Sequence, residues 1–130
     1  MILPVTLCLA AAAAILNIWM SMRIGKVRQS AKVSIGDGGN ELLICRMRSQ
    51  ANFIENVPLV LLLIAGIELT GRGGLWLPVV GALFMLARLA HPLGMERPSP
   101  NVLRAGGTAV SMLTQLGLAI VAVLIVIGLF

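Results

Sequence analysis

An arginine, an asparagine and a glutamate are spaced along the stretch RSQANFIENVP, residues 48–58, so that they can act together. On a helix, positions four and seven apart share a face, so Arg48, Asn52 and Glu55 form one stripe about two turns long. A guanidinium, an amide and a carboxylate on one face can hold a small ligand that carries opposite charges. Pro58 follows the stripe and frees the backbone carbonyl of Ile54, one turn earlier.

A second group of polar residues follows later in the chain. Arg88 and His91 stand three positions apart, and Arg97 and Arg104 come in the next connection. We expect a compact helical bundle to bring these side chains to the depth of the Arg48 stripe. Several cations and one or two carboxylates would then converge at one level. Such a pocket suits a small anionic or zwitterionic ligand.

Each of these residues also has a purely structural interpretation. Arg48 and Arg88 could anchor helix ends at a membrane surface, which is the commonest role of an arginine there. Asn52 and Glu55 could bond between helices, and His91 could be a loop histidine. The shared helical face of the stripe favours a ligand site over unrelated anchors.

The elements that must position these residues are membrane-spanning helices. Of the 130 residues, 58% are apolar and 12% are charged, whereas charged residues make up about a quarter of a soluble domain. Crossing a hydrocarbon core of roughly 30 Å takes about 20 mainly apolar residues. Such windows run over residues 2–22, 51–69, 75–90 and 108–130. The sequence therefore predicts an all-α integral membrane protein, with a single domain over residues 1–130 and a four-transmembrane-helix bundle.

The connections between the windows carry most of the charge. We expect a polar, basic segment over residues 23–48, a tight turn over 70–74 and a loop with proline and glycine over 91–107. Nine of the ten basic residues lie in or beside the two long connections, and only Arg72 lies at the other end. Because lysine and arginine in short loops are retained in the cytoplasm, we expect both termini outside and both long loops inside.

Other classes of protein fit these residues less well. The first window is not preceded by lysine or arginine and is followed at once by basic residues, which favours a retained helix over a cleaved signal peptide. The pI near 10.7 does not indicate a nucleic-acid partner, because no binding motif is present and membrane orientation explains the charge. Cys8 and Cys45 have neither a disulfide pattern nor metal-ligand spacing, so we expect no metal.

The residues from Arg48 to Pro58 resemble the signature R-x-Q-x-N-x-x-E-x-x-P of the MAPEG family, the membrane-associated proteins in eicosanoid and glutathione metabolism. VSIGDGG at 33–39, ARLAHPLG at 87–94 and RAG at 104–106 are similar to segments of bacterial members, so the resemblance covers essentially the whole chain. It implies a homotrimer in the bacterial inner membrane. Glutathione would bind between neighbouring subunits, with the active site facing the cytoplasm.

The resemblance also implies roles for individual residues. The positions that match glutathione contacts are Arg28, Arg48, Gln50, Asn52, Glu55, Arg88 and His91. Glu55 suits the amine of the ligand, and Arg104 resembles the arginine thought to stabilise the glutathione thiolate. The loop lengths leave open whether Arg28 or Arg23 is the contact from the first helix.

The implied function is a glutathione-dependent membrane transferase or peroxidase of detoxifying type. Its second substrate would be a small lipophilic electrophile or hydroperoxide that approaches from the membrane lipid. Nearby cations lower the pKa of a thiol from about 8.5, so that the reactive thiolate forms near neutral pH.

Two alternatives remain. The chain contains no tyrosine, and Asn56 stands where many relatives have one, so any phenol contact is absent or falls to His91, Asn56 or water. This departure keeps open a non-catalytic membrane protein that binds lipid or glutathione in the same intersubunit cleft. A small multidrug exporter is the third interpretation, but we would expect a buried carboxylate in its first span, and the first span here has Asn17 and no carboxylate.

Overall fold

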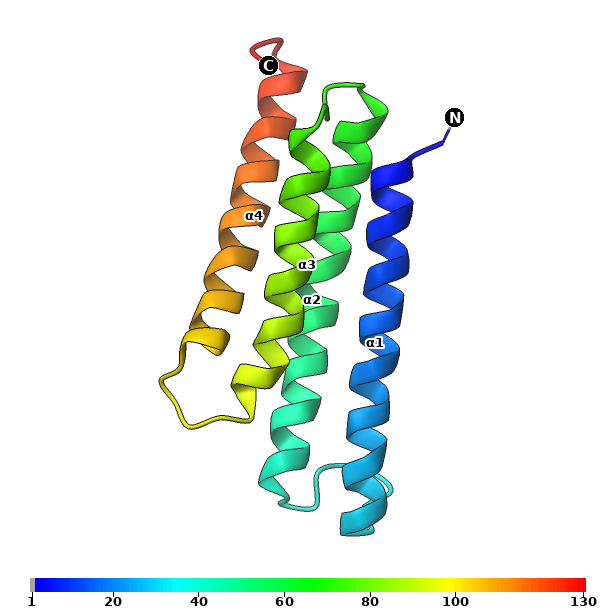
Figure 1. Ribbon diagram of the computed structural model, residues 1–130, viewed down its shortest axis with the longest axis vertical. Helices are drawn as coiled ribbons and strands as arrows, with labels where there is room; N and C mark the ends of the chain where they lie inside the picture. Colours follow the sequence, from blue (N-terminus) through cyan, green and yellow to red (C-terminus); the bar gives the residue numbers. More distant parts are fainter. Residues whose placement is uncertain (1) are drawn as a thin grey trace.

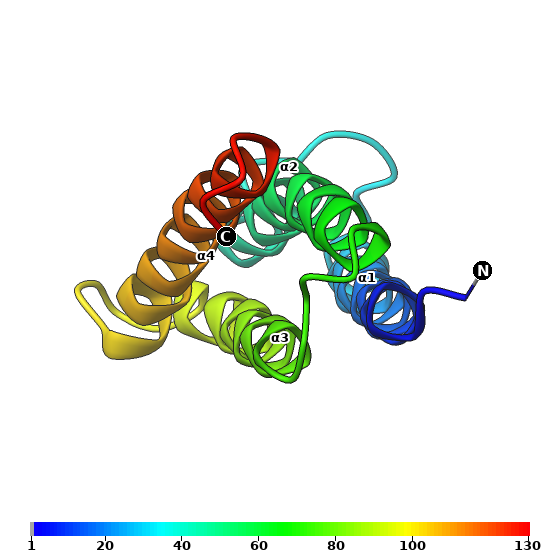
Figure 2. The same ribbon diagram turned by 90° about the horizontal axis from the view of Figure 1, so that it is seen from above.

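Four long helices make up the computed structural model, which describes residues 2–130 (Figure 1). The helices are α1, Pro4–Ala31; α2, Glu41–Leu69; α3, Trp76–Met95; and α4, Val102–Val126. Consecutive helices run in opposite directions, so both termini lie at one end of the bundle (Figure 1). Seen from above, α2 and α3 face each other across the middle, with α1 and α4 on opposite sides (Figure 2).

Asparagines begin two of the helices. The side chain of Asn40 accepts a hydrogen bond from the backbone N–H of Leu43 at 2.9 Å, and that of Asn101 accepts one from Arg104 at 2.9 Å. These side chains satisfy backbone donors that have no partner within the first turn of a helix. Helix α1 ends at Ala31, and the residue that caps it, Lys32, has a left-handed backbone with a φ of 54°. The α1–α2 and α3–α4 connections therefore begin or end at defined capping residues.

The helices are longer than the apolar windows in the sequence. The expected basic connection over residues 23–48 is mostly helical, because α1 continues to Ala31 and α2 begins at Glu41. The prediction of a loop over residues 91–107 was wrong at both ends, because α3 continues to Met95 and α4 begins at Val102. A hydropathy window finds only the part of a helix inside hydrocarbon. Polar turns beyond it stay helical where caps and neighbouring helices support them.

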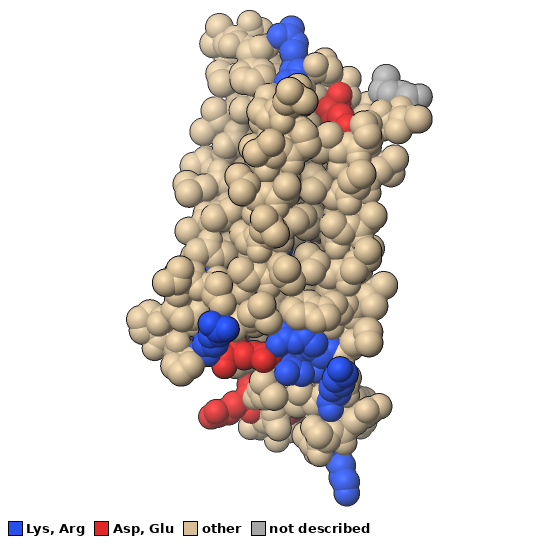
Figure 3. Space-filling model, viewed as in Figure 1, with Lys and Arg blue, Asp and Glu red and all other residues tan. Residues whose placement is uncertain are grey.

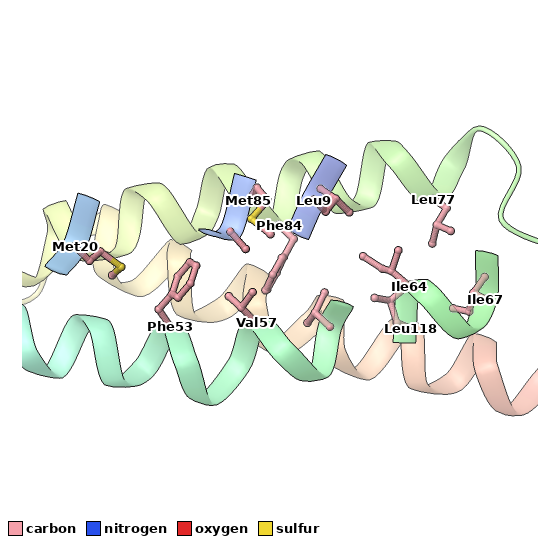
Figure 4. Close-up of a cluster of buried hydrophobic side chains, with 12 residues drawn as sticks. Leu9, Met20, Phe53, Val57, Ile64, Ile67, Leu77, Phe84, Met85 and Leu118 are labelled. Carbon is pink, nitrogen blue, oxygen red and sulfur yellow. The ribbon is translucent and has the colours of Figure 1, made fainter. Parts of the chain in front are cut away.

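All four helices are long and apolar enough to cross a membrane. In the space-filling view, charged side chains gather at the two ends and leave an uncharged band between them (Figure 3). The sequence prediction of an all-helical bundle with four membrane-spanning segments is confirmed at this level. Within the band, buried apolar side chains fill the centre of the bundle, among them Phe53, Val57, Ile64, Phe84 and Leu118 (Figure 4). In lipid, such side chains hold helices together mainly by close packing.

We call the end with the two long connections the basic end, and the end with both termini the terminal end. At the basic end, α1 and α2 continue beyond the α3–α4 connection (Figure 1). The last turns of α1 and the first turn of α2 enclose a small apolar cluster of Ile24, Val27 and Leu43. Val33 and Met47 pack against this cluster. This hairpin is thus held by its own core.

The terminal end is held by a carboxylate. Glu68 of α2 accepts hydrogen bonds from the backbone N–H groups of Val5 and Thr6, at 2.8 and 2.9 Å, and from the Thr6 hydroxyl at 2.7 Å. Arg72 donates to the backbone carbonyl of Phe130 at 2.5 Å. Glu68 and Arg72 therefore have different partners, because the first helical turn of α1 offers the carboxylate unsatisfied donors.

Candidate functional site

Arg88 lies at the centre of a buried polar cluster that joins three helices. Its side chain on α3 is 1% exposed. One terminal nitrogen donates to Oδ1 of Asn52 on α2 at 2.8 Å, and the other donates to Oγ of Ser111 on α4 at 3.1 Å. The guanidinium also lies over the ring of Phe53, 5.8 Å from its centroid. Arg88 is therefore an internal polar contact and not an anchor at the membrane surface.

Further polar side chains continue this cluster along α2 and α4. Asn56 donates to the backbone carbonyl of Asn52 at 2.7 Å, which is the carbonyl one turn earlier. Gln115 donates to Oδ1 of Asn56 at 2.6 Å. Ser111 donates its own proton to the carbonyl of Gly107 at 2.7 Å, which leaves its oxygen lone pairs free to receive Arg88. The side chains around Arg88 are thus oriented by a connected set of hydrogen bonds.

A hollow of about 250 Å³ opens beside Arg88. We call it the polar hollow; its lining residues are Asn52, Glu55, Asn56, Arg88, Thr108, Ser111 and Met112. A larger groove of about 390 Å³ between α3 and α4 has an almost wholly apolar lining, as expected of a surface that faces lipid. Glu55 is exposed, so its carboxylate can reach a ligand in the polar hollow. Asn52 and Glu55 of the predicted stripe meet Arg88 of the second polar group here, whereas Arg48 is not among the lining residues.

Arg88 has no carboxylate partner in the described structure. Within residues 2–130, ion pairs of 4.0 Å or less join Glu96 to Arg23 and to Arg46, and none includes Arg88. Nε of Arg88 and Nδ1 of His91 are buried and make no hydrogen bond there. A buried cation without a counter-charge is costly, and at membrane depth such a residue usually serves a function. The cluster thus has unused capacity to receive an anion.

His91 packs against the first turns of α4, at Gly107, and is 3% exposed. Its Cβ and Cα lie so close to Gly107 that a Cβ at that glycine would be 2.7 Å from one and 3.1 Å from the other. The loop interpretation of His91 is wrong, because α3 runs on through Pro92 to Met95. The structure places His91 between α3 and α4, one turn from Arg88.

Arg104 lies on the first turn of α4, three residues after the cap Asn101. Its side chain is exposed and makes no hydrogen bond or ion pair within residues 2–130. Thr108 and Ser111 follow it at four and seven positions, so that Arg104 shares a helical face with two residues of the polar hollow. Its guanidinium is free to contact a ligand beside that hollow.

The predicted contacts on α2 divide between two faces. Arg48 is exposed, whereas Gln50 donates to Asn17 Oδ1 at 3.1 Å and to Ser21 Oγ at 2.7 Å, both on α1. Positions 50 and 52 are about 200° apart around a helix. The structure therefore brings Asn52 and Glu55 to the polar hollow and turns Gln50 away from it, toward α1.

Arg28 is engaged in the α1–α2 loop. Its guanidinium donates to the carbonyl of Gly36 at 2.7 Å and, at 3.5 Å, to that of Val33. Arg23 lies elsewhere, in an ion pair with Glu96 that also includes Arg46 at 2.7 Å. Neither Arg23 nor Arg28 lies in the lining of the polar hollow.

Several residues of the site were not found by the sequence analysis. Ser111 and Thr108 share the helical face of Arg104, and this spacing is the signal that could have identified them. Glu96 is the one acidic residue between the third and fourth windows, yet nothing in the sequence shows that it pairs with arginines of α1 and α2. That pairing depends on the packing of three helices.

Comparison with known proteins identifies the family of the chain. The pattern that defines the MAPEG family matches residues 6–124. The chain is similar to the inner membrane protein YecN of Escherichia coli K12, with 26% identity over 100 residues, which are 77% of this chain and 76% of YecN. YecN of Escherichia coli O6:H1 has the same identity and coverage. The match over residues 6–124, on four membrane-capable helices, shows that the chain belongs to the MAPEG family.

Proposed function

We propose that this protein is a glutathione-dependent membrane transferase or peroxidase that acts on lipophilic electrophiles or hydroperoxides. The observation that carries the proposal is the buried Arg88, which faces the polar hollow together with Glu55 and has no carboxylate partner within residues 2–130. A cation and an anion on the walls of one hollow suit a ligand with both charges. Membership of the MAPEG family supports a glutathione-related activity.

The residues around the polar hollow fit the groups of glutathione. This peptide carries two carboxylates, one ammonium and one thiol. Arg88 and Arg48 supply guanidinium donors for the carboxylates, and Glu55 supplies an acceptor for the ammonium. Arg104 supplies a permanent positive charge for the ionised thiol, because a guanidinium keeps its proton at all relevant pH values. Each ionised group of the ligand thus has a complementary side chain.

The proposed site lies between subunits of a homotrimer. About 250 Å³ is smaller than the roughly 300–1,000 Å³ of a typical ligand pocket, so the polar hollow of one protomer can hold only part of a tripeptide. Gln50 and Arg28 do not line it. A neighbouring protomer that presents its α1–α2 face would contribute these two residues and cover the exposed Arg48 and Glu55. Such a cover also removes charged side chains from lipid.

Within the proposed site, each residue has a separate task. Arg88, Asn52 and Glu55 bind and orient the peptide, and Arg104 favours the thiolate over the thiol. The bound thiolate supplies a sulfur that displaces a leaving group from an electrophilic carbon, or two glutathiones supply the two electrons that reduce a hydroperoxide to alcohol and water with formation of the disulfide. The lipophilic substrate reaches the site along the apolar helix surfaces.

We also propose the location and orientation of the protein. YecN is an inner membrane protein, and we propose the same bacterial membrane here. The basic end carries nine of the ten lysines and arginines, which favours a cytoplasmic basic end and external termini. The site would then draw on cytoplasmic glutathione.

A non-catalytic membrane protein that binds lipid or glutathione in the same cleft is the second candidate. The absence of tyrosine from the chain favours it, because His91 is buried and Asn56 already bonds to Asn52 and Gln115. Neither side chain is a free proton donor in the way that a phenol would be.

Calorimetric titration of glutathione into the detergent-purified protein tests the proposal. We expect saturable binding that is lost in Arg48→Ala and in Glu55→Ala. Arg72→Ala is the matched control, because Arg72 lies at the terminal end and should leave the affinity unchanged. No binding by the unmodified protein would refute the glutathione site.

The ultraviolet absorbance of a thiolate then separates catalysis from binding. Saturating glutathione should produce this absorbance, and Arg104→Ala should remove it. S-methylglutathione cannot ionise at sulfur, so its affinity should be the same with and without Arg104. Binding of glutathione with no thiolate signal at neutral pH would favour the non-catalytic candidate.

A further inference from the structure

The start of α4 is pressed against the end of α3 at Gly94. A Cβ at this position would lie 2.3 Å from the backbone nitrogen of Arg104 and 2.8 Å from its Cα. Both atoms belong to the main chain, so no side-chain rotation could relieve the overlap. Glycine at position 94 is therefore what allows the peptide group of Arg104 to approach α3 this closely.

Asn101 ties the same two segments together. Its Oδ1 accepts from the Arg104 N–H at 2.9 Å, and its Nδ2 donates to the carbonyl of Gly94 at 2.8 Å. A second, longer contact of Nδ2 reaches the carbonyl of Pro98 at 3.3 Å. One amide side chain thus caps α4 and also joins that cap to α3.

Both backbone groups of Arg104 are fixed by side chains. Its N–H is held by Asn101, and its carbonyl accepts from the Thr108 hydroxyl at 3.0 Å. Its guanidinium, in contrast, has no partner within residues 2–130 and extends from this fixed base. The position of the base relative to Arg88 and the polar hollow depends on the contact between Gly94 and Asn101.

We propose that Gly94 and Asn101 are positioning residues that set where the Arg104 guanidinium stands relative to the bound glutathione sulfur. This inference rests on the proposed function, and it adds the residues through which Arg104 acts. The interaction of two charges falls with their separation, so a displaced Arg104 favours the thiolate less. The rest of the peptide, held by Arg88, Asn52 and Glu55, should bind as before.

Gly94→Ala is the first test, with Gly106→Ala as its matched control. A Cβ at Gly106, on the same turn as Arg104, has no atom within 4 Å to meet. We expect Gly94→Ala to lower the ratio of thiolate to thiol in bound glutathione about tenfold at neutral pH, which is a rise of about one unit in the pKa of the bound thiol. The affinity for S-methylglutathione should stay within about twofold. Gly106→Ala should change neither.

Asn101→Ser separates the two bonds of Asn101. Serine can still cap α4 but is too short to reach the carbonyl of Gly94 as well. Asn40→Ser is the control, because Asn40 caps α2 with the same 2.9 Å bond and has no bond to another helix. We expect a several-fold loss of thiolate in Asn101→Ser and none in Asn40→Ser.

Three results would be decisive. A pH titration of thiolate absorbance that Gly94→Ala and Asn101→Ser leave unchanged, while Arg104→Ala abolishes it, would overturn the positioning role and leave the proposed function intact. Absence of the thiolate in the unmodified protein at saturating glutathione would overturn both. Backbone amide exchange over residues 101–108 should also be faster in both variants than in their controls, and equal rates would count against the role even without a ligand.

Discussion

Two groups of arginines at the basic end of the bundle differ in what balances their charge. Arg23 and Arg46 converge on Glu96, so that α1, α2 and the end of α3 are joined by a carboxylate shared between two guanidiniums. Arg88 is more deeply buried than either, yet its partners are the neutral side chains of Asn52 and Ser111. The first group has a carboxylate between its two guanidiniums, whereas the second has no carboxylate partner within residues 2–130.

This difference separates a structural role from a binding role. A guanidinium that meets a carboxylate in its own chain has less to offer a ligand, since it already has an ion-pair partner. A guanidinium held in place by neutral groups keeps its charge for an incoming anion while its orientation is fixed. By this criterion we propose that Arg88 contacts the ligand and that Arg23 belongs to the scaffold. Substitutions that lower the affinity for glutathione without changing stability, or lower stability without changing affinity, can test the distinction.

The largest effect is expected from removing the charge of Arg88. Arg88→Met keeps much of the side-chain volume and should weaken glutathione binding by at least about 30-fold, or roughly 2 kcal/mol. Its thermal midpoint in detergent should change little, because an unpaired buried charge is lost along with two hydrogen bonds. Calorimetry and thermal unfolding measure the two quantities. An affinity within a few fold of the unmodified protein would remove Arg88 from the site.

Glu96→Gln is expected to have the opposite profile. It leaves Arg23 and Arg46 side by side without their shared carboxylate, and we expect a loss of about 1–3 kcal/mol in unfolding free energy, since the groups are partly exposed. Glutathione affinity should be retained. Unfolding in a detergent titration measures the stability. A variant of normal stability that no longer binds glutathione would reverse the assignment of the two groups.

A smaller loss of stability is expected at the terminal end. Glu68→Gln removes the negative charge that caps the first turn of α1 through Val5 and Thr6, and should cost about 0.5–1 kcal/mol. Glu41→Gln is the control, because the Glu41 side chain is exposed and has no hydrogen-bond partner within residues 2–130. Equal unfolding free energies for the two variants would show that the hydrogen bonds of Glu68 to Val5 and Thr6 do not stabilise α1.

The smallest effect is expected at the edge of the polar cluster. Gln115→Leu removes the 2.6 Å bond to Asn56 and should reduce glutathione affinity by less than about threefold, because Asn52 is still fixed by Arg88. Titration calorimetry with replicate measurements can resolve this change. A loss as large as that in Arg88→Met would mean that the contacts of Asn56 determine the affinity as much as Arg88 does.

Much of the fold could be predicted from the sequence. The apolar windows predict the number of spans, and the pattern from Arg48 to Pro58 predicts the family, which the comparison confirms. The positions of helix ends could not be predicted, because asparagine caps and the Ile24 cluster extend the helices beyond the apolar region. Hydropathy reports the solvent around a helix and does not report where its hydrogen bonds stop.

The candidate site could be predicted only in part. Helical spacing correctly places Asn52 and Glu55 together, and Arg88 joins them in the structure. The same spacing cannot tell which way α2 is rotated against α1, and this rotation turns Gln50 toward Asn17 and Ser21. The partners of Arg28 and Glu96 depend on loop geometry and on the packing of three helices, neither of which leaves a local pattern.

The unequal lengths of the helices have a consequence for the surrounding lipid. Helix α1, with 28 residues, is about 42 Å long, whereas α3, with 20 residues, is about 30 Å. Helix α3 therefore matches the hydrocarbon thickness with nothing to spare, and a thicker bilayer would draw its last turns, which carry Arg88 and His91, deeper into the acyl region. Glutathione affinity should then fall as acyl chains lengthen in nanodiscs of defined lipid, and a constant affinity would exclude this coupling. Bilayer thickness would thus regulate the affinity for glutathione without direct contact between lipid and the site.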